Sequence, residues 1–171
     1  MTPPPQPADP VIADLDAAAR APEFAMHAAE IMRRLERRLD EAVDTPMTWE
    51  EVPLTAFDRP LPSEIASCWV FVLRPGTELP AERHSNSHQR SLSLKGTGRF
   101  ELRENGRWVS YPITDGTWAS ASTGMWHRWF AGPEPLALLS FHTAHAEDLV
   151  EEHAARPDDY DGPTEGRRYQ G

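Results

Sequence analysis

The sequence predicts an all-β fold, a sandwich or barrel, preceded by an amphipathic helix. From about residue 48 onward, short runs rich in Val, Trp, Phe, Ser and Leu alternate with turn signals about every ten residues, a pattern typical of sandwiches and barrels. Before them, apolar residues step by three or four through residues 11–44, which is the period of one helix face. A length of 171 residues suits one domain with a sizeable core.

The helix is expected in an N-terminal arm spanning residues 11–45. Pro22 suits the first turn of a helix and Pro46 ends the segment, with a shorter helix allowed before Pro22. An amphipathic helix must bury its stripe on its own barrel or on a partner chain, so we expect a homodimer. The expected apolar stripe consists of Phe24, Ala28, Ile31, Leu35, Leu39 and Val43.

The barrel is expected within residues 46–145. Asn105-Gly106 is a strong signal for a two-residue hairpin, while Gly96 and Asp115-Gly116 mark further turns. The expected strands are 67–73, 89–94, 99–103, 108–111, 118–121, 126–130 and 136–143.

Both ends of the chain are expected to lie outside the barrel. Residues 1–10 hold five prolines and are expected to form a disordered tail. Residues 146–171 are expected to form a short helix over 147–155 and then a mobile acidic tail outside the core.

The net charge of −10 comes from 27 acidic and 17 basic residues, unevenly placed. Residues 1–60 carry −6, residues 61–145 carry +1, and residues 146–171 carry −5. Nucleic acid and anionic membrane surfaces both attract an excess of Lys and Arg, so neither is an expected partner. The nearly neutral middle leaves room for a local cation site and a small-molecule ligand or substrate.

The single cysteine, Cys68, excludes an intramolecular disulfide and fits a reducing compartment. The sequence has no run of 18 apolar residues, and its first ten residues are not those of a secretory signal. We therefore expect a cytoplasmic protein.

Two segments carry the chemistry-bearing residues, GTELPAERHSNSHQRSLSLKG at 76–96 and GTWASASTGMWH at 116–127. Together they resemble the two signature motifs of the cupin superfamily, and the resemblance covers about residues 65–145, half the chain. Counting back from the closing Gly96 places Gln89 where the family usually has Glu. His84 takes the second histidine position, and Glu82 stands at the first.

The second motif matches the family at Gly116, Gly124 and His127, the last being the metal-binding histidine of that motif. Ser122 stands where the family has proline, and Ala131 stands at a later asparagine position. The resemblance implies a cupin-type jelly-roll barrel, in which many members bind a divalent metal.

Two sets of metal ligands remain open from the sequence. In the family register, Glu82, His84, Gln89 and His127 converge; in the alternative, His84 and His127 join His88 in a three-histidine site. Glu82 and His84 share a face if their segment is extended, and a turn at 85–87 would bring Gln89 to the same side. Either set offers imidazole and oxygen donors that suit Fe, Mn, Ni, Co or Zn, and a third possibility is that no metal binds.

The remaining histidines are not favoured as metal ligands. His27 and His153 are expected on the surface, His145 is expected to be exposed, and His142 is favoured as a surface or satisfied core residue.

Residues beside the candidate ligands are expected to have structural roles. Arg90 and Arg128 each follow a candidate ligand by one position, so strand alternation points them away from the metal and toward ion pairs. Trp126 and Trp129 flank His127 and could wall a pocket, although core packing is the favoured interpretation.

The resemblance implies several functions. A metal-dependent enzyme acting on a small molecule comes first, with dioxygenase ahead of isomerase or lyase. The alternative is a non-catalytic binding or sensor module for a small metabolite. Cupins are often dimers, which agrees with the homodimer expected from the helix.

Overall fold

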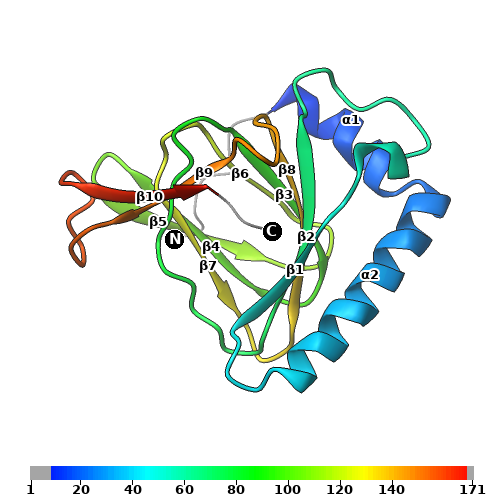
Figure 1. Ribbon diagram of the computed structural model, residues 1–171, viewed down its shortest axis with the longest axis horizontal. Helices are drawn as coiled ribbons and strands as arrows, with labels where there is room; N and C mark the ends of the chain where they lie inside the picture. The colour runs from blue at the N-terminus through cyan, green and yellow to red at the C-terminus, as the bar shows by residue number, and fades with distance from the viewer. Residues whose placement is uncertain (1–8, 169–171) are drawn as a thin grey trace.

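The computed structural model describes residues 9–168, so residues 1–8 and 169–171 lie outside the described part of the chain. Two β-sheets face each other, and two helices cover the outer face of one of them (Figure 1). In chain order the described elements are α1 (Pro10–Ala19), α2 (Pro22–Glu41), β1 (Met47–Glu51), the 3-10 turn η1 (Leu54–Ala56), β2 (Ser67–Leu73), β3 (Gln89–Lys95), β4 (Gly98–Glu104), β5 (Arg107–Ile113), β6 (Trp118–Ala121), β7 (His127–Ala131), β8 (Leu136–His142), β9 (Val150–Ala154) and β10 (Thr164–Arg168).

Within the described residues, the strands form sheets in the orders β1-β2-β8-β3-β6 and β5-β4-β7, together with the hairpin β9–β10. The strands predicted from the sequence all occur, within one or two residues of their expected ends. Asn105 and Gly106 both have positive φ, 49° and 77°, as the predicted two-residue turn requires. Strand β1 was not predicted; it pairs with β2 from Met47↔Leu73 to Glu51↔Trp69.

The helical arm contains two helices, and it begins earlier than predicted. The Asp9 carboxylate caps α1 by accepting a hydrogen bond from the Val11 backbone N–H at 3.0 Å, and it also binds the guanidinium of Arg90. The prediction of a disordered tail over residues 1–10 is therefore wrong for Asp9 and Pro10. Its other residues, 1–8, lie outside the described part.

The apolar stripe of α2 packs on the outer face of its own five-stranded sheet. Its buried residues are Phe24, Ala28, Ile31, Leu35 and Leu39. Val43 was expected in the stripe but is 76% exposed, because α2 ends at Glu41 and Arg74 binds the carbonyls of Leu39 and Ala42. Burial on its own barrel satisfies the stripe, so the homodimer stays a prediction.

Strand alternation divides the core into two layers. In β2, Cys68, Val70 and Val72 face the helices, whereas Trp69 and its alternate neighbours face the space between the sheets. The same division holds in β8, where the residues of the inner face end in Ser140 and His142. Because both faces of β2 and β8 are buried, both strands are apolar along most of their length.

The predicted helix over 147–155 is wrong, because this segment contains strand β9. It pairs with β10 to form a hairpin that lies on the side of the molecule away from the helices (Figure 1). The bridge between Arg83 and Glu152 joins β9 to the barrel, and the Asn86 side chain binds the backbone of Asp148 and Val150. These tertiary backbone pairings outweigh the local helix preference. Neither described helix is long and apolar enough to cross a membrane.

Candidate metal centre

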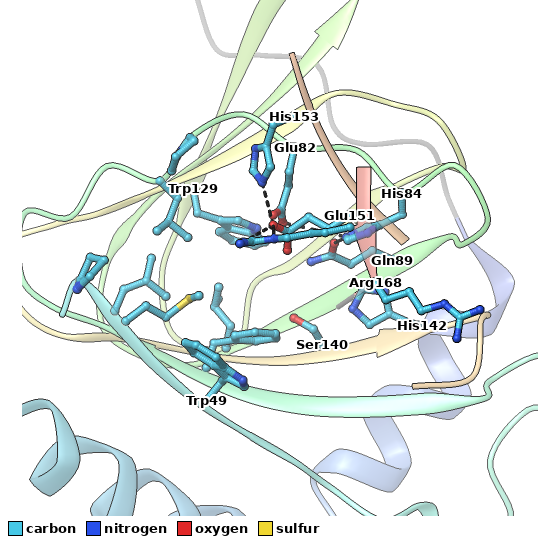
Figure 2. A pocket seen from close by; sticks show the side chains of 18 residues that line it. Trp49, Glu82, His84, Gln89, Trp129, Ser140, His142, Glu151, His153 and Arg168 are labelled. Atoms are coloured by element: carbon cyan, nitrogen blue, oxygen red, sulfur yellow. Dashed lines mark hydrogen bonds and ion pairs between the residues drawn. The ribbon is translucent and has the colours of Figure 1, made fainter. Parts of the chain in front are cut away.

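A cavity of about 600 Å³ lies between the two sheets, next to the β9–β10 hairpin (Figure 2). Polar donors gather at one side of it and apolar side chains line the rest. The lining residues used below are Met47, Trp49, Phe71, Leu73, Glu82, His84, Gln89, Trp129, Leu138, Ser140, His142, Glu151, His153, Arg167 and Arg168.

Glu82 and His127 are held opposite each other by an antiparallel bridge. The backbone N–H of Glu82 donates to the His127 carbonyl at 2.9 Å, and that of His127 donates to the Glu82 carbonyl at 2.8 Å. The segment before β3 therefore runs as an extended strand along β7. This places the two side chains next to each other on the inner face.

A turn at Ser85–Asn86 determines which of the following residues faces the cavity. Glu82 and His84 precede it on one face, as the extended segment predicts, and Gln89 returns to the cavity after it. The predicted turn thus brings together Glu82, His84, Gln89 and His127.

His88 does not join them. Its Nε2 lies 3.8 Å from an Asp9 carboxylate oxygen, and it is absent from the cavity lining. The three-histidine arrangement of His84, His88 and His127 is therefore not formed, because alternation in β3 points His88 and Gln89 to opposite sides.

The rings of His84 and His127 are both oriented through Nδ1. His84 Nδ1 donates to the Val150 carbonyl at 2.8 Å, and His127 Nδ1 donates to the Met125 carbonyl at 3.0 Å. A carbonyl only accepts, so in the neutral form each ring carries its proton on Nδ1 and presents a lone pair at Nε2. Metal-binding histidines typically donate their other ring N–H to a carbonyl in this way.

The donor atoms converge on one place. Glu82 Oε1 lies 3.4 Å from His127 Nε2 and 4.0 Å from His84 Nε2, and one donor atom from each residue lies within 4.8 Å of the others. The His127 side chain is fully buried, and its Nε2 has no hydrogen-bond partner among the described residues. A buried, unsatisfied lone pair facing a carboxylate fits a site for a cation.

The charges of these groups also suit a cation. Burial raises the pKa of Glu82, but a hydrogen bond from a protonated His127 and the positive charges of His127 and His84 outweigh burial and lower it to about 2. Glu82 is therefore ionised when these rings are protonated, and a bound cation would supply the same positive charge when they are neutral. Burial lowers the pKa of His84 more than Glu82 raises it, which favours the neutral ring that binds metals.

Gln89 completes the group with a neutral oxygen. Its Oε1 lies 3.0 Å from His84 Nε2, and its Nε2 donates to Ser91 Oγ at 3.1 Å. With the His84 proton on Nδ1, two lone pairs face each other in this arrangement and repel, unless a cation lies between them. Rotating the amide by 180° instead lets its NH₂ donate to His84, because the two amide orientations are not distinguished by shape.

The hairpin brings a second charged group to the cavity that the sequence did not predict. His153 Nδ1 donates to the Ala81 carbonyl at 2.9 Å, and its Nε2 donates to Glu151 Oε1 at 2.7 Å (Figure 2). Arg167 Nη2 donates to the same Glu151 oxygen at 2.7 Å. The Glu151 hydrogen bond raises the pKa of His153 despite its burial, and both its nitrogens donate. Because Glu151 already pairs with His153 and Arg167, this group is better described as an internal ion-pair network than as a second metal site.

The other histidine predictions have mixed outcomes. His153 is half-buried in this network rather than on the surface, and His27 is half-buried on α2. His145 is exposed, as predicted. His142 is 2% exposed and lines the cavity, with its ring centroid 5.0 Å from that of His84. Burial holds its pKa well below the usual value.

The neighbouring residues follow strand alternation. Trp129 lines the cavity, whereas Trp126 lies outside it and donates to the Tyr160 carbonyl. Arg128 pairs with Glu101, as predicted for an outward residue. Arg90 also points away from the donors, but it is 4% exposed and pairs with Asp9 instead of lying on the surface.

No protein-family model matches the sequence, and no curated protein matches it at a significant level. Among solved structures, salicylate 1,2-dioxygenase from Pseudaminobacter salicylatoxidans is similar with a TM-score of 0.53 and 14% identity, over 69% of this chain and 33% of that chain. Oxalate oxidase gives a TM-score of 0.49 at 13% identity, over 59% of this chain and 52% of that chain. A protein from Klebsiella pneumoniae with a double-stranded β-helix domain gives a TM-score of 0.44 at 20% identity, over 58% of this chain and 77% of that chain.

The chain therefore has the fold of the cupin superfamily, a double-stranded β-helix, as its two sequence motifs predict. The likeness spans about half of the oxalate oxidase chain and a third of the salicylate dioxygenase chain. At 13% and 14% identity, this likeness shows the fold of the barrel alone.

Proposed function

We propose that this protein is a small metal-dependent enzyme of the cupin fold, with a dioxygenase as the first candidate reaction and an isomerase or lyase as the next. The metal would be a divalent transition ion, Fe, Mn, Ni, Co or Zn, held by His84, His127 and Glu82 with Gln89 as a further oxygen donor. The small-molecule substrate would occupy the adjoining cavity.

One observation carries the proposal. The Nε2 atoms of His84 and His127 face the ionised carboxylate of Glu82 at 4.0 and 3.4 Å, while both Nδ1 atoms are engaged by backbone carbonyls. Three pre-oriented donors thus meet beside the cavity, which Glu82 and His84 line, and His127 Nε2 has no hydrogen-bond partner within residues 9–168. Two histidines with one carboxylate form the donor set typical of non-haem iron oxygenases.

The residues of this chain have distinct roles in such an enzyme. When bound, a divalent ion of this kind supplies Lewis acidity and, if it is iron, reactivity with O₂. Glu82 supplies the one negative charge, His84 and His127 supply neutral nitrogens, and Gln89 adds an oxygen without adding charge. The apolar walls exclude water from the substrate and so strengthen electrostatic interactions in the cavity.

The proposal is tested by metal analysis of the full chain purified without a histidine tag and reconstituted separately with Fe(II), Mn(II) and Zn(II). Stoichiometric metal is expected in the wild type. Its loss is expected in His84→Ala, His127→Ala and Glu82→Gln, the last of which keeps the size of the side chain. His145→Ala is the matched control, because His145 is exposed and far from the cavity lining.

Absence of stoichiometric metal from the wild type under all three conditions overturns the site. So does full retention of metal by His127→Ala in a variant whose thermal unfolding is cooperative. For the reaction, O₂ uptake by the Fe(II)-loaded wild type in a screen of small organic acids supports a dioxygenase. Substrate turnover with Zn(II), without O₂ uptake, favours an isomerase or lyase instead. Binding without turnover indicates a non-catalytic binding or sensor module.

A further inference from the structure

The cavity has two chemically different sides. Apolar side chains of β1 and β2, including Trp49, Phe71 and Leu73, form one side, and Trp129 of β7 and Leu138 of β8 continue it. The metal donors and the β9–β10 hairpin form the other side, and Figure 2 shows Trp49 lying across the cavity from Glu151 and His153. A ligand that matches this cavity has an apolar body and a polar end.

The charged side chains that line the cavity indicate the sign of that polar end. Glu151 is the acidic residue that β9 contributes to the cavity lining, and it already binds His153 and Arg167. Arg168 also lines the cavity; it is exposed at the cavity mouth and has no carboxylate partner among the described residues. The lining therefore contains two carboxylates, Glu82 and Glu151, against two guanidiniums and the imidazolium of His153, an excess of positive charge before any metal binds.

A divalent ion at the donor group increases this excess. Glu82 is the one carboxylate among its ligands, so a bound divalent ion leaves that group positive. At this donor group, where His84 and His127 are buried, an uncompensated positive charge is costly. An anionic ligand group next to the donors and β10 would compensate it, and Arg is well suited to bind a carboxylate.

We propose that the cavity binds a small organic carboxylate, with its apolar body against the Trp49–Trp129 side and its carboxylate between the metal donors and β10. This inference rests on the proposed metal-dependent function, whose substrate class it names. The volume of about 600 Å³ suits a small molecule, since ligand cavities commonly measure about 300–1,000 Å³.

Isothermal titration of the metal-reconstituted full chain tests the inference with three probes. Benzoate has both the apolar body and the charge, benzamide has nearly the same shape without charge, and acetate has the charge without the body. Benzoate is expected to bind at least about tenfold more tightly than benzamide, as one charge-assisted interaction provides. It is also expected to bind at least about tenfold more tightly than acetate, because the ring adds apolar surface that is buried on binding.

Arg168→Gln is expected to weaken benzoate binding by about three- to tenfold and to leave benzamide binding unchanged. Arg107→Gln is the matched control, because Arg107 is exposed on the β4–β5 hairpin and away from the cavity lining. The double variant Arg167→Gln/Arg168→Gln is expected to abolish the preference for benzoate over benzamide.

Equal binding of benzoate and benzamide by the metal-loaded wild type overturns the inference. So does a full preference for benzoate in the double variant. Metal content is measured separately in every sample, so the two proposals fail in different ways. If the protein carries no metal but still prefers benzoate, the metal-dependent function fails while the carboxylate cavity stands.

Discussion

The imidazole rings of His84 and His127 lie with their centroids 5.4 Å apart, and both donate Nδ1–H to backbone carbonyls of their own chain. Because the carbonyls belong to Val150 and Met125, the orientation of both rings depends on β9 and on the turn before β7. The Nε2 lone pair of His84 is therefore positioned by backbone 66 residues away, whereas that of His127 is positioned by backbone two residues before it. This relationship makes the donor group sensitive to the packing of the hairpin.

Replacing Gln89 with Glu is expected to strengthen metal binding by on the order of tenfold, because it adds a second carboxylate to the donors. Without metal, the same change should lower the melting temperature, because two buried carboxylates then repel each other. Thermal unfolding with and without Mn(II) or Zn(II) measures both effects. Gln89→Met, of similar size but without an oxygen donor, should weaken metal binding, and an equal affinity in both variants would contradict a role for this position.

His88→Ala is expected to retain stoichiometric metal, because His88 faces Asp9 on the other side of β3 from the donors. Metal analysis in parallel with His84→Ala separates the two ligand sets predicted from the sequence. Loss of metal from a well-folded His88→Ala variant would show that the three-histidine set forms in solution.

Gly96→Ala is expected to destabilise the protein strongly. Gly96 has φ +91°, and an added Cβ would lie 2.2 Å from the Pro135 carbonyl oxygen. Gly106→Ala is the matched control. The φ of Gly106 is +77°, so alanine meets a similar backbone strain there, of order 1–2 kcal/mol, but no atom lies within 4 Å of the added Cβ. Chemical denaturation should show a larger loss of unfolding free energy for Gly96→Ala, and equal losses would indicate that the close approach to Pro135 relaxes.

Leu35→Ala is expected to reduce the free energy of unfolding by about 2–5 kcal/mol. Leu35 is 0% exposed between α2 and the sheet, so its truncation leaves a cavity. Val43→Ala is the control, because Val43 is 76% exposed and its truncation should change stability by less than about 0.5 kcal/mol. Urea denaturation measures both, and a small effect of Leu35→Ala would mean that α2 contributes little to the core.

The β9–β10 hairpin is expected to loosen as pH rises. Glu151 raises the pKa of His153 above 6.5, so the stabilisation from the His153–Glu151 pair is fully present below about pH 6.5 and is lost as pH rises through the higher folded-state pKa. Amide hydrogen exchange in β9, corrected for the intrinsic rate, measures this loss. His153→Gln should remove the dependence and His145→Gln should not; an unchanged profile in His153→Gln would assign the dependence to another group.

The sequence determined the fold class, most strand positions and a turn near residues 85–87, but it left both Gln89 and His88 open as ligands. These features follow from local rules: alternation along strands, helical spacing in α2, and turn residues such as Asn105-Gly106. The cupin motifs added the register in which Glu82, His84, Gln89 and His127 meet.

The tertiary structure alone decided the rest of the cavity. The chain 147–155 has a locally helical pattern, yet it forms β9 because it pairs with β10 and with Arg83. Through this pairing Glu151 and His153 enter the cavity, and His84 gains the carbonyl of Val150. Backbone hydrogen bonds such as those between Arg83 and Glu152, about 70 positions apart in sequence, leave no signal in local periodicity. The sequence therefore indicated the candidate metal ligands, whereas only the folded chain showed the charged hairpin beside them.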